Sequence, residues 1–320
     1  MTLAPWPLAE YELLPLPTLS PELLGAIVRR HGLDLDGPIV AMHSTGVVHA
    51  LWALGSQWVL RVPKDEAMCI GDHRCEAIAI PLARAAGVRT PGIVAFNDSG
   101  DILDVPYSIV ERIDGHDLVS LRQDNPAHDA TYRQLGVQLA LLHRVGQSST
   151  PHPWLREPEA GPAEALFDEA SQAGLIHEDG ITWLQNLVTR LDDSISSGPP
   201  APRVLLHNDV KPDNVMLDRR GSLHLIDWGD AGYGDPVLDF HSLPLRSAQA
   251  ALQGYRANIE GDLTLETRLI RRVVARSISG LRRTPRLGPS WYRPIAATLT
   301  DLFTFSADHP DLWRAWTYAR

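Results

Sequence analysis

Short apolar runs separated by turn residues fill the first third of the chain, a pattern typical of strands. Before them, Ser20 and Pro21 begin an amphipathic segment that is predicted as a helix, because serine caps helices and proline suits their first turn. Three strands are then predicted at Ile39–Met42, Val47–Leu54 and Trp58–Val62. Since tight turns join them, they favour an antiparallel meander.

A helix and two further strands complete this region. The helix is predicted over Arg74–Ala86 and is closed by Gly87, and the strands are predicted at Ile93–Phe96 and Tyr107–Ile113. The order strand, strand, strand, helix, strand, strand indicates an antiparallel sheet that carries one helix.

From His116 onward, helical periodicity dominates the chain. Helices are predicted over Thr131–His143, Ala163–Ala173, Ile181–Ile195 and most of the chain after Val237, and short strands at Val204–Leu206, Val215–Leu217 and Leu223–Ile226. We therefore predict an α+β protein with two lobes. Residues 1–112 form an N-terminal lobe with an antiparallel sheet and a helix, and residues 113–320 form a mainly helical C-terminal lobe.

Charge and composition narrow the class of partner. The 320 residues carry a formal net charge of −10, and 44% of them are hydrophobic. An acidic surface disfavours nucleic acid and anionic membranes as partners, because both bind basic surfaces. It either attracts a cationic ligand or serves only to keep the protein soluble. There is no long apolar run, so no membrane span is expected, and the N-terminus does not resemble a signal peptide. The two cysteines, Cys69 and Cys75, suit a reducing cytoplasm.

The segment Leu205–Asp227 carries the candidate chemistry. A buried strand leads into Asp209, Asn214 follows five residues later, and a predicted hairpin ends in Asp227. The hairpin brings these three side chains to one side. One carboxylate to orient a hydroxyl and two oxygen ligands for Mg²⁺ are what phosphoryl transfer requires, while a plain polar turn is the alternative.

Three linked motifs carry a family resemblance. His207-Asn208-Asp209-Val210-Lys211-Pro212-Asp213-Asn214 resembles the protein-kinase catalytic loop H-R-D-L-x-x-x-N. Ile226-Asp227-Trp228 and the downstream Gly234-Asp235-Pro236 with Asp239-Phe240 resemble instead the aminoglycoside phosphotransferase family, and no A-P-E segment of protein kinases is present. The resemblance runs from about Ile39 to Phe240 and implies a protein-kinase-like fold.

The resemblance also implies roles in the C-terminal lobe. Asp209 is expected as the catalytic base or hydroxyl-orienting residue, and Asn214 and Asp227 as the Mg²⁺ ligands. Lys211 is a candidate to neutralise the transferring phosphoryl group. His207 is expected to brace the loop by hydrogen bonding, and Asp235 and Asp239 to cap and anchor the helix that follows.

In the N-terminal lobe the resemblance implies a nucleotide site. Ser44 and Gly46 occupy the place of the phosphate-covering loop, although a plain hairpin turn explains them equally. Arg61 stands where most kinases have a lysine for the α- and β-phosphates, with Lys64 as the reserve candidate. Glu76 is expected to pair with that cation, or to favour its helix dipole alone. The backbones of Glu111 and Ile113 are expected to meet adenine.

The acceptor is predicted from charge and from the resemblance together. Nine acids lie between residues 157 and 193, namely Glu157, Glu159, Glu164, Asp168, Glu169, Glu178, Asp179, Asp192 and Asp193. They form either an acidic wall for a cationic acceptor or a solvated helix face. Eight arginines between Arg268 and Arg293 pair with this region or contact something else.

The function we expect is ATP-dependent O-phosphorylation of a small molecule, with GTP not excluded and Mg²⁺ as cofactor. An aminoglycoside or related antibiotic is the first acceptor class. A macrolide or a small metabolite such as choline, homoserine or a sugar amine is the second. A nucleotide-binding regulatory pseudokinase is the alternative from another class. It is disfavoured because the chain keeps Asp209, Asn214 and Asp227. We expect a monomer or a dimer, and the sequence does not favour one of these oligomeric states over the other.

Overall fold

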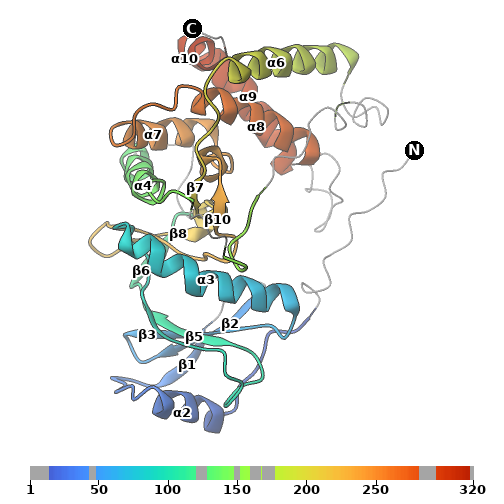
Figure 1. Cartoon of the computed structure of the whole chain (residues 1–320). Coiled ribbons are helices and arrows are strands. Elements are labelled where there is room, and N and C mark those ends of the chain that lie inside the picture. The colour runs from blue at the N-terminus through green and yellow to red at the C-terminus, as the bar shows by residue number, and fades with distance from the viewer. Residues whose placement is uncertain are drawn as a thin grey trace.

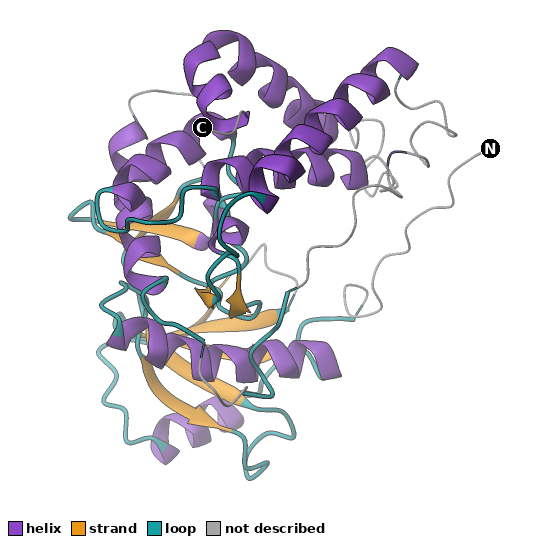
Figure 2. Ribbon diagram, turned by 45° about the horizontal axis from the view of Figure 1, so that its top comes forward, coloured by secondary structure: helices purple, strands orange, loops and turns teal. Residues whose placement is uncertain are grey.

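The computed structural model describes residues 14–42, 48–119, 128–147, 152–158, 167, 177–280 and 293–317. Figures 1 and 2 show two lobes, a sheet crossed by one long helix and a larger part made mostly of helices. The fold is therefore α+β and bilobal, as the order of strand and helix patterns predicts.

The sheet of the N-terminal lobe is antiparallel, with the strand order β1-β2-β3-β5-β4 in the described residues. Its strands are β1 (Ile39–Met42), β2 (His49–Leu54), β3 (Trp58–Pro63), β4 (Ile93–Asn97) and β5 (Tyr107–Glu111). Apolar residues that alternate along these strands pack against helix α2 (Pro21–Arg30). Ser20 Oγ accepts a hydrogen bond from the N–H of Leu23 at 3.3 Å, so the predicted helix start is confirmed.

Helix α3 spans Ala67–Ala85, so the prediction that it starts at Arg74 is wrong. The signal that the prediction missed is a cap. The Glu66 carboxylate accepts hydrogen bonds from the N–H groups of Met68 and Cys69, which have no partner inside the helix. Because the helix starts earlier, Glu76 lies in its middle, and a favourable helix dipole does not explain this residue.

One face of α3 packs into the core of the other lobe. Cys75, Ala79 and Ala83 are fully buried in the same hydrophobic cluster as the C-terminal helices. The Cys75 Sγ also lies 3.3 Å from the carbonyl oxygen of Ala231. Figure 1 shows α3 between the sheet and the helical lobe. The helix therefore fixes how the two lobes face each other.

The C-terminal lobe contains the short strands and the helices that position the candidate loop. The strands are β6 (Gly115–Asp117), β7 (Val204–Leu206), β8 (Val215–Asp218), β9 (Leu223–Leu225) and β10 (Gly232–Gly234). The helices are α4 (Asp129–Leu142), α6 (Glu178–Ser196), α7 (Leu245–Arg256), α8 (Leu265–Gly280), α9 (Arg293–Asp308) and α10 (Pro310–Thr317). The predicted helices around residues 131–143 and 181–195 are confirmed, whereas the one at Ala163–Ala173 falls outside the described residues except for Phe167.

Two glycines let α4 and α7 approach closely. A Cβ atom at Gly136 would stand 1.8 Å from the carbonyl oxygen of Ala251, and one at Gly254 would stand 2.1 Å from that of Arg133. Contacts this short exclude any side chain. The α4–α7 pair is therefore tightly packed. None of the described helices is long and apolar enough to cross a membrane.

Candidate active site

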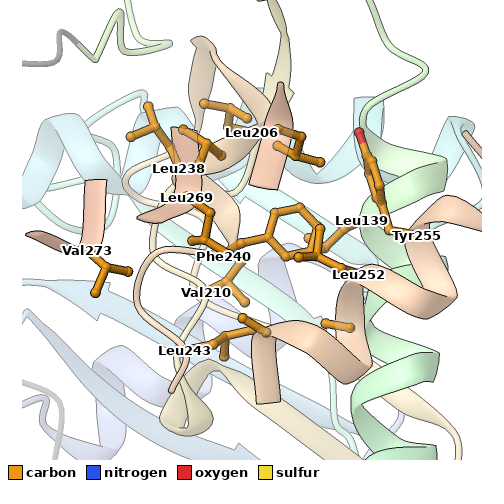
Figure 3. Close-up of a cluster of buried hydrophobic side chains, with 14 of the residues drawn as sticks. Leu139, Leu206, Val210, Leu238, Phe240, Leu243, Leu252, Tyr255, Leu269 and Val273 are labelled. Atoms are coloured by element: carbon orange, nitrogen blue, oxygen red, sulfur yellow. The ribbon is translucent and has the colours of Figure 1, made fainter. Parts of the chain in front are cut away.

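Residues 207–214 form the loop between β7 and β8, and two small ladders hold its ends. Strand β7 pairs with β10, and β8 pairs with both β6 and β9. In the middle of the loop, Val210 is buried in the hydrophobic cluster, close to Phe240 and Leu243 in Figure 3. An apolar anchor between polar neighbours fixes the loop to the core while Asp209 stays partly exposed.

Asp239 holds the start of this loop through hydrogen bonds to its backbone. Its carboxylate accepts hydrogen bonds from the N–H of His207 at 3.0 Å and of Asn208 at 2.6 Å, and His143 Nε2 lies 2.9 Å away. Burial alone would raise the pKa of Asp239, but the hydrogen bond and charge of His143 outweigh it, and the pKa lies below its ordinary value. The prediction that Asp239 serves the following helix is therefore wrong, because its contacts are with the candidate loop and with His143. Asp235 does cap that segment, through the N–H of Val237.

Asn208 and Asp227 have unusual backbones. Their φ angles are +64° and +67°, a left-handed conformation that costs free energy outside glycine. At Asn208 the strain is compensated by a hydrogen bond from its Nδ2 to the carbonyl of Asp230 at 3.1 Å. Non-glycine residues in this conformation cluster at functional sites, and here one precedes the candidate acid Asp209 and the other is the candidate acid Asp227 itself.

Asp209 Oδ2 is held by two donors. Lys211 Nζ lies 2.6 Å away and Asn214 Nδ2 lies 2.7 Å away. Burial would lower the pKa of Lys211, but Asp209 and the neighbouring carboxylates outweigh burial and raise it, so the ammonium stays charged. A carboxylate fixed in this way has the chemistry of a general base toward a hydroxyl.

The backbone brings Asn214 and Asp227 together. The N–H of Ile226 donates to the carbonyl of Asn214 at 3.0 Å, and His207 Nε2 lies 2.9 Å from the carbonyl of Ile226. His207 therefore braces the two segments, as the sequence predicts. The amide nitrogen of Asn214 donates to Asp209, which leaves its amide oxygen as a candidate metal ligand together with the half-exposed carboxylate of Asp227. Hard oxygen ligands of this kind fit Mg²⁺.

Arg61, Glu76 and Asp227 meet at the interface of the two lobes. Arg61 Nη2 lies 2.7 Å from Glu76 Oε1 and 3.4 Å from Asp227 Oδ1. Burial raises the pKa of Glu76 to about 8, an effect that Arg61 opposes and Asp227 reinforces. The ionised form of Glu76 therefore depends on the guanidinium beside it.

The other candidates for the nucleotide site are placed less directly. Lys64 is buried and follows the end of β3, where its N–H donates to the carbonyl of Val48. Ser44 and Gly46 lie outside the described residues. Of the two candidate cations, Arg61 is the one whose ion pair with Glu76 the structure shows.

The linker between the lobes contains Glu111 and Ile113. The Glu111 carboxylate accepts from Arg84 and from the N–H of Gly92, so it lies against α3 and the residue before β4. An open hollow of about 340 Å³ lies beside Ile113, between the linker and the turn of the β8–β9 hairpin. The linker ends at Gly115, where a Cβ would stand 2.0 Å from the carbonyl oxygen of Leu217. Glycine is therefore required by the close approach of β6 and β8.

The acidic region is partly neutralised and partly solvated. Asp192 pairs with Arg271 and Glu157 with Arg203, so the prediction that the arginine-rich segment contacts the acids is confirmed for Arg271. Glu178, Asp179 and Asp193 are exposed on α6. The remaining four acids, Glu159, Glu164, Asp168 and Glu169, lie outside the described residues.

Two sets of residues at the site escaped the sequence-based prediction. Arg156 forms ion pairs with Asp72 of α3 and with Asp230, three residues after Asp227, and thereby ties the lobes together. His49 and His73 lie behind Arg61. The sequence could indicate them only indirectly. The two histidines lie in β2 and in α3, one turn before Glu76, and they approach Arg61 only when the strand and the helix pack together.

Comparison with known proteins places the chain in a family. Residues 45–305 match the model of the phosphotransferase enzyme family, APH. The chain belongs to this family. A stretch of 128 residues is 29% identical to CBL-interacting protein kinase 1 of Oryza sativa subsp. japonica, and this match covers 38% of the chain but only 25% of the rice protein.

Solved structures share the fold at low sequence identity. A choline/ethanolamine kinase family protein from Mesorhizobium loti is 15% identical with a TM-score of 0.58, covering 92% of this chain and 98% of that one. The GDP complex of wild-type aminoglycoside 2'-phosphotransferase-IIIa is 19% identical with a TM-score of 0.53, covering 90% and 98%. Spectinomycin phosphotransferase APH(9)-Ia, in complex with ADP and spectinomycin, is 14% identical with a TM-score of 0.54, covering 91% and 95%.

Proposed function

We propose that the protein transfers the γ-phosphate of ATP to a hydroxyl group of a small molecule. The observation that carries this proposal is the fixed carboxylate of Asp209, held by Lys211 and Asn214 on a loop that Asp239 anchors. Phosphoryl transfer is catalysed mainly by positioning and charge neutralisation, and these contacts supply both. Family membership agrees with the proposal.

The roles we propose follow from the chemistry of each group. Asp209 accepts the hydroxyl proton as the bond from the acceptor oxygen to the γ-phosphorus forms and the bond from that phosphorus to the β-phosphate oxygen breaks, so that ADP leaves. Lys211 compensates the charge of the transferring phosphoryl group. Asn214 and Asp227 hold Mg²⁺, which would neutralise phosphate oxygens.

For the nucleotide, we propose that Arg61, positioned by Glu76, contacts the α- and β-phosphates. The backbone N–H groups of Ser44 and Gly46 cover the phosphates. The backbones of Glu111 and Ile113 bind adenine. GTP is the competing nucleotide, because one of the similar structures is a GDP complex.

We propose an aminoglycoside or a related cationic antibiotic as the acceptor, acted on in the cytoplasm, with resistance or self-protection as the biological role. Support comes from the net charge of −10 and from structural similarity to proteins whose complexes hold such compounds. A small amino-alcohol is the second candidate, because the similarity to the choline/ethanolamine kinase family protein is at least as strong.

An ADP-release screen tests the proposal. The acceptors are aminoglycosides, macrolides, peptide antibiotics and small amino-alcohols, each with ATP or GTP and Mg²⁺. We expect turnover with one class, and a loss of about 10²- to 10⁴-fold in kcat for Asp209→Ala, because a general base contributes that much. Nucleotide binding by the variant should persist. Nucleotide binding without turnover of any acceptor would support the regulatory pseudokinase instead.

A further inference from the structure

A buried cluster of two histidines lies behind the arginine of the nucleotide site. His49 of β2, His73 of α3 and Glu76 one turn later are all buried, and one ligand atom from each lies within 4.8 Å of the others. Side chains of these types commonly hold a metal ion. In this structure Arg61 already supplies a cation to the cluster, since its Nη2 lies 2.7 Å from Glu76 Oε1 and 3.3 Å from His49 Nδ1.

The arginine determines where the histidine protons lie. A guanidinium only donates hydrogen bonds, so His49 Nδ1 must accept from Arg61 Nη2. The proton of neutral His49 is then on Nε2, which lies 3.0 Å from His73 Nδ1. His73 accepts there, and its own proton is on Nε2. The contacts therefore form a chain with one direction, from Arg61 through His49 to His73.

The environment keeps both rings neutral. Burial, with the positive charge of Arg61, lowers the pKa of His73 to about 3 and places the pKa of His49 well below its ordinary value. Glu76 Oε2 lies 4.0 Å from His73 Nδ1, the nitrogen that also faces His49, and the ring of Phe96 lies beside that of His73. A protonated His49 would present a donor to a donor, so the chain exists only in the neutral state.

We propose that His49 and His73 are positioning residues that orient Arg61 toward the nucleotide phosphates and adapt the site to arginine instead of lysine. The Nη2 group lies close to three acceptors on three different elements, namely Glu76 on α3, His49 on β2 and Asp227 after β9. The planar guanidinium presents its N–H groups in fixed directions, so the acceptors around Nη2 restrict the orientation of its plane. A lysine ammonium can rotate freely and gains no orientation from His49.

The first experiment measures the affinity of Mg·ATP for variants at position 49, and it rests on the proposed nucleotide site. His49→Leu removes the acceptor, and we expect the Kd to rise about tenfold, as for loss of a hydrogen bond to a charged group. His49→Asn keeps an acceptor near the Nδ1 position and should stay close to the native protein. In an Arg61→Lys background, His49→Leu should have no further effect on the Kd.

The matched control is His31→Leu. His31 lies in the same lobe and contacts the hydroxyl of Tyr107 at 3.0 Å, so this variant should lower the Tm without changing the Kd. An equal effect of His49→Leu in the native protein and in the Arg61→Lys background would overturn the proposal. So would a His49→Leu variant that loses stability but binds nucleotide normally.

A second experiment needs no nucleotide, so it separates this proposal from the proposed function. Nitrogen NMR of the histidine rings at about pH 7 reads the protonated nitrogen of each ring. We expect His49 and His73 to be neutral with the proton on Nε2. In the Arg61→Lys variant, we expect the nitrogen signals of His49 to change. A proton on His49 Nδ1, or a charged His49 ring, would contradict the chain even if ATP binds.

Discussion

At the scale of single residues, a substitution of Asp239 tests most directly what holds the loop of residues 207–214 in place. It accepts from two backbone N–H groups of the loop and from His143 while fully buried. Asp239→Ala leaves these donors without an acceptor. We expect the free energy of unfolding to fall by about 3 kcal/mol or more and kcat to fall with it, measured by urea unfolding and turnover.

The matched control for Asp239 is Asp98→Ala. Asp98 also accepts two hydrogen bonds, from Arg74, but on the surface. Exposed ion pairs contribute about 0 to 1 kcal/mol, so this variant should be nearly as stable as the native protein. Equal losses for both variants would show that Asp239 does not anchor the loop.

The buried histidines give a pH dependence of stability. The pKa of His73 is about 3 in the native state, whereas a histidine in the unfolded chain titrates near 6.5. Because the unfolded state binds the proton first, stability is fully present above about pH 6.5 and decreases as the pH falls toward about 3. Urea unfolding at several pH values should show this loss.

His73→Asn should make that curve flatter, since asparagine does not titrate. The exposed His177 supplies the control, and His177→Ala should lower the whole curve through loss of the α6 cap without flattening it. A curve identical for the native protein and His73→Asn would mean that His73 is not buried in its neutral form.

At the scale of elements, the position of α3 depends on a contact from the segment 152–158. Arg156 pairs with Asp72 of α3 and with Asp230, and Trp154 lies under the Arg74 guanidinium at 4.8 Å. We expect Arg156→Ala to weaken the packing of α3 and so to increase hydrogen exchange of its amides. It should also lower kcat, because Glu76 of α3 is then no longer held in position against Arg61.

Arg219→Ala is the control for Arg156, since Arg219 forms an ion pair with Asp114 that is mostly exposed. It should change neither exchange in α3 nor turnover. If Arg156→Ala gave the same exchange pattern as Arg219→Ala, the segment 152–158 would have no part in positioning α3.

The packing of α4 on α7 predicts opposite effects for two glycines in helices. Gly136→Ala would place a methyl group 1.8 Å from a backbone oxygen of α7, and we expect a loss of about 1 to 3 kcal/mol or more. Gly71 in α3 has nothing within 4 Å of the added Cβ, so Gly71→Ala should stabilise by about 0.5 to 1 kcal/mol. Thermal unfolding of both variants measures the difference, and equal signs would contradict the close packing.

The sequence predicts elements well where the pattern is local. The cap at Ser20 and the apolar periodicity of α4 and α6 depend on neighbours in the chain, and the structure shows the elements there. The start of α3 was missed because Glu66 is an unusual cap. Strands β6 and β10 were missed because three residues with glycine show no alternation, and distant strands define them.

At the scale of the whole molecule, the motifs predict which residues of the loop gather, but they do not predict what holds the loop. Asp209, Lys211 and Asn214 are close together in sequence and could be assigned by resemblance. The supports come from afar, since His143, Asp239 and Tyr255 meet only when α4 and α7 pack. We propose the boundary between the lobes after residue 112, although α3, which precedes it, contributes to the core of the C-terminal lobe.

The central claim is that the Asp209 loop transfers phosphate from ATP to a small-molecule hydroxyl. Phosphorus NMR of the protein with Mg·ATP and the acceptor found by the screen tests it most directly, because the product bond is observed. We predict a phosphate ester signal that grows as ADP forms, and that grows at least about 10²-fold more slowly with Asp209→Ala although this variant still binds ATP. Equal ester formation by Asp209→Ala and the native protein would contradict the claim.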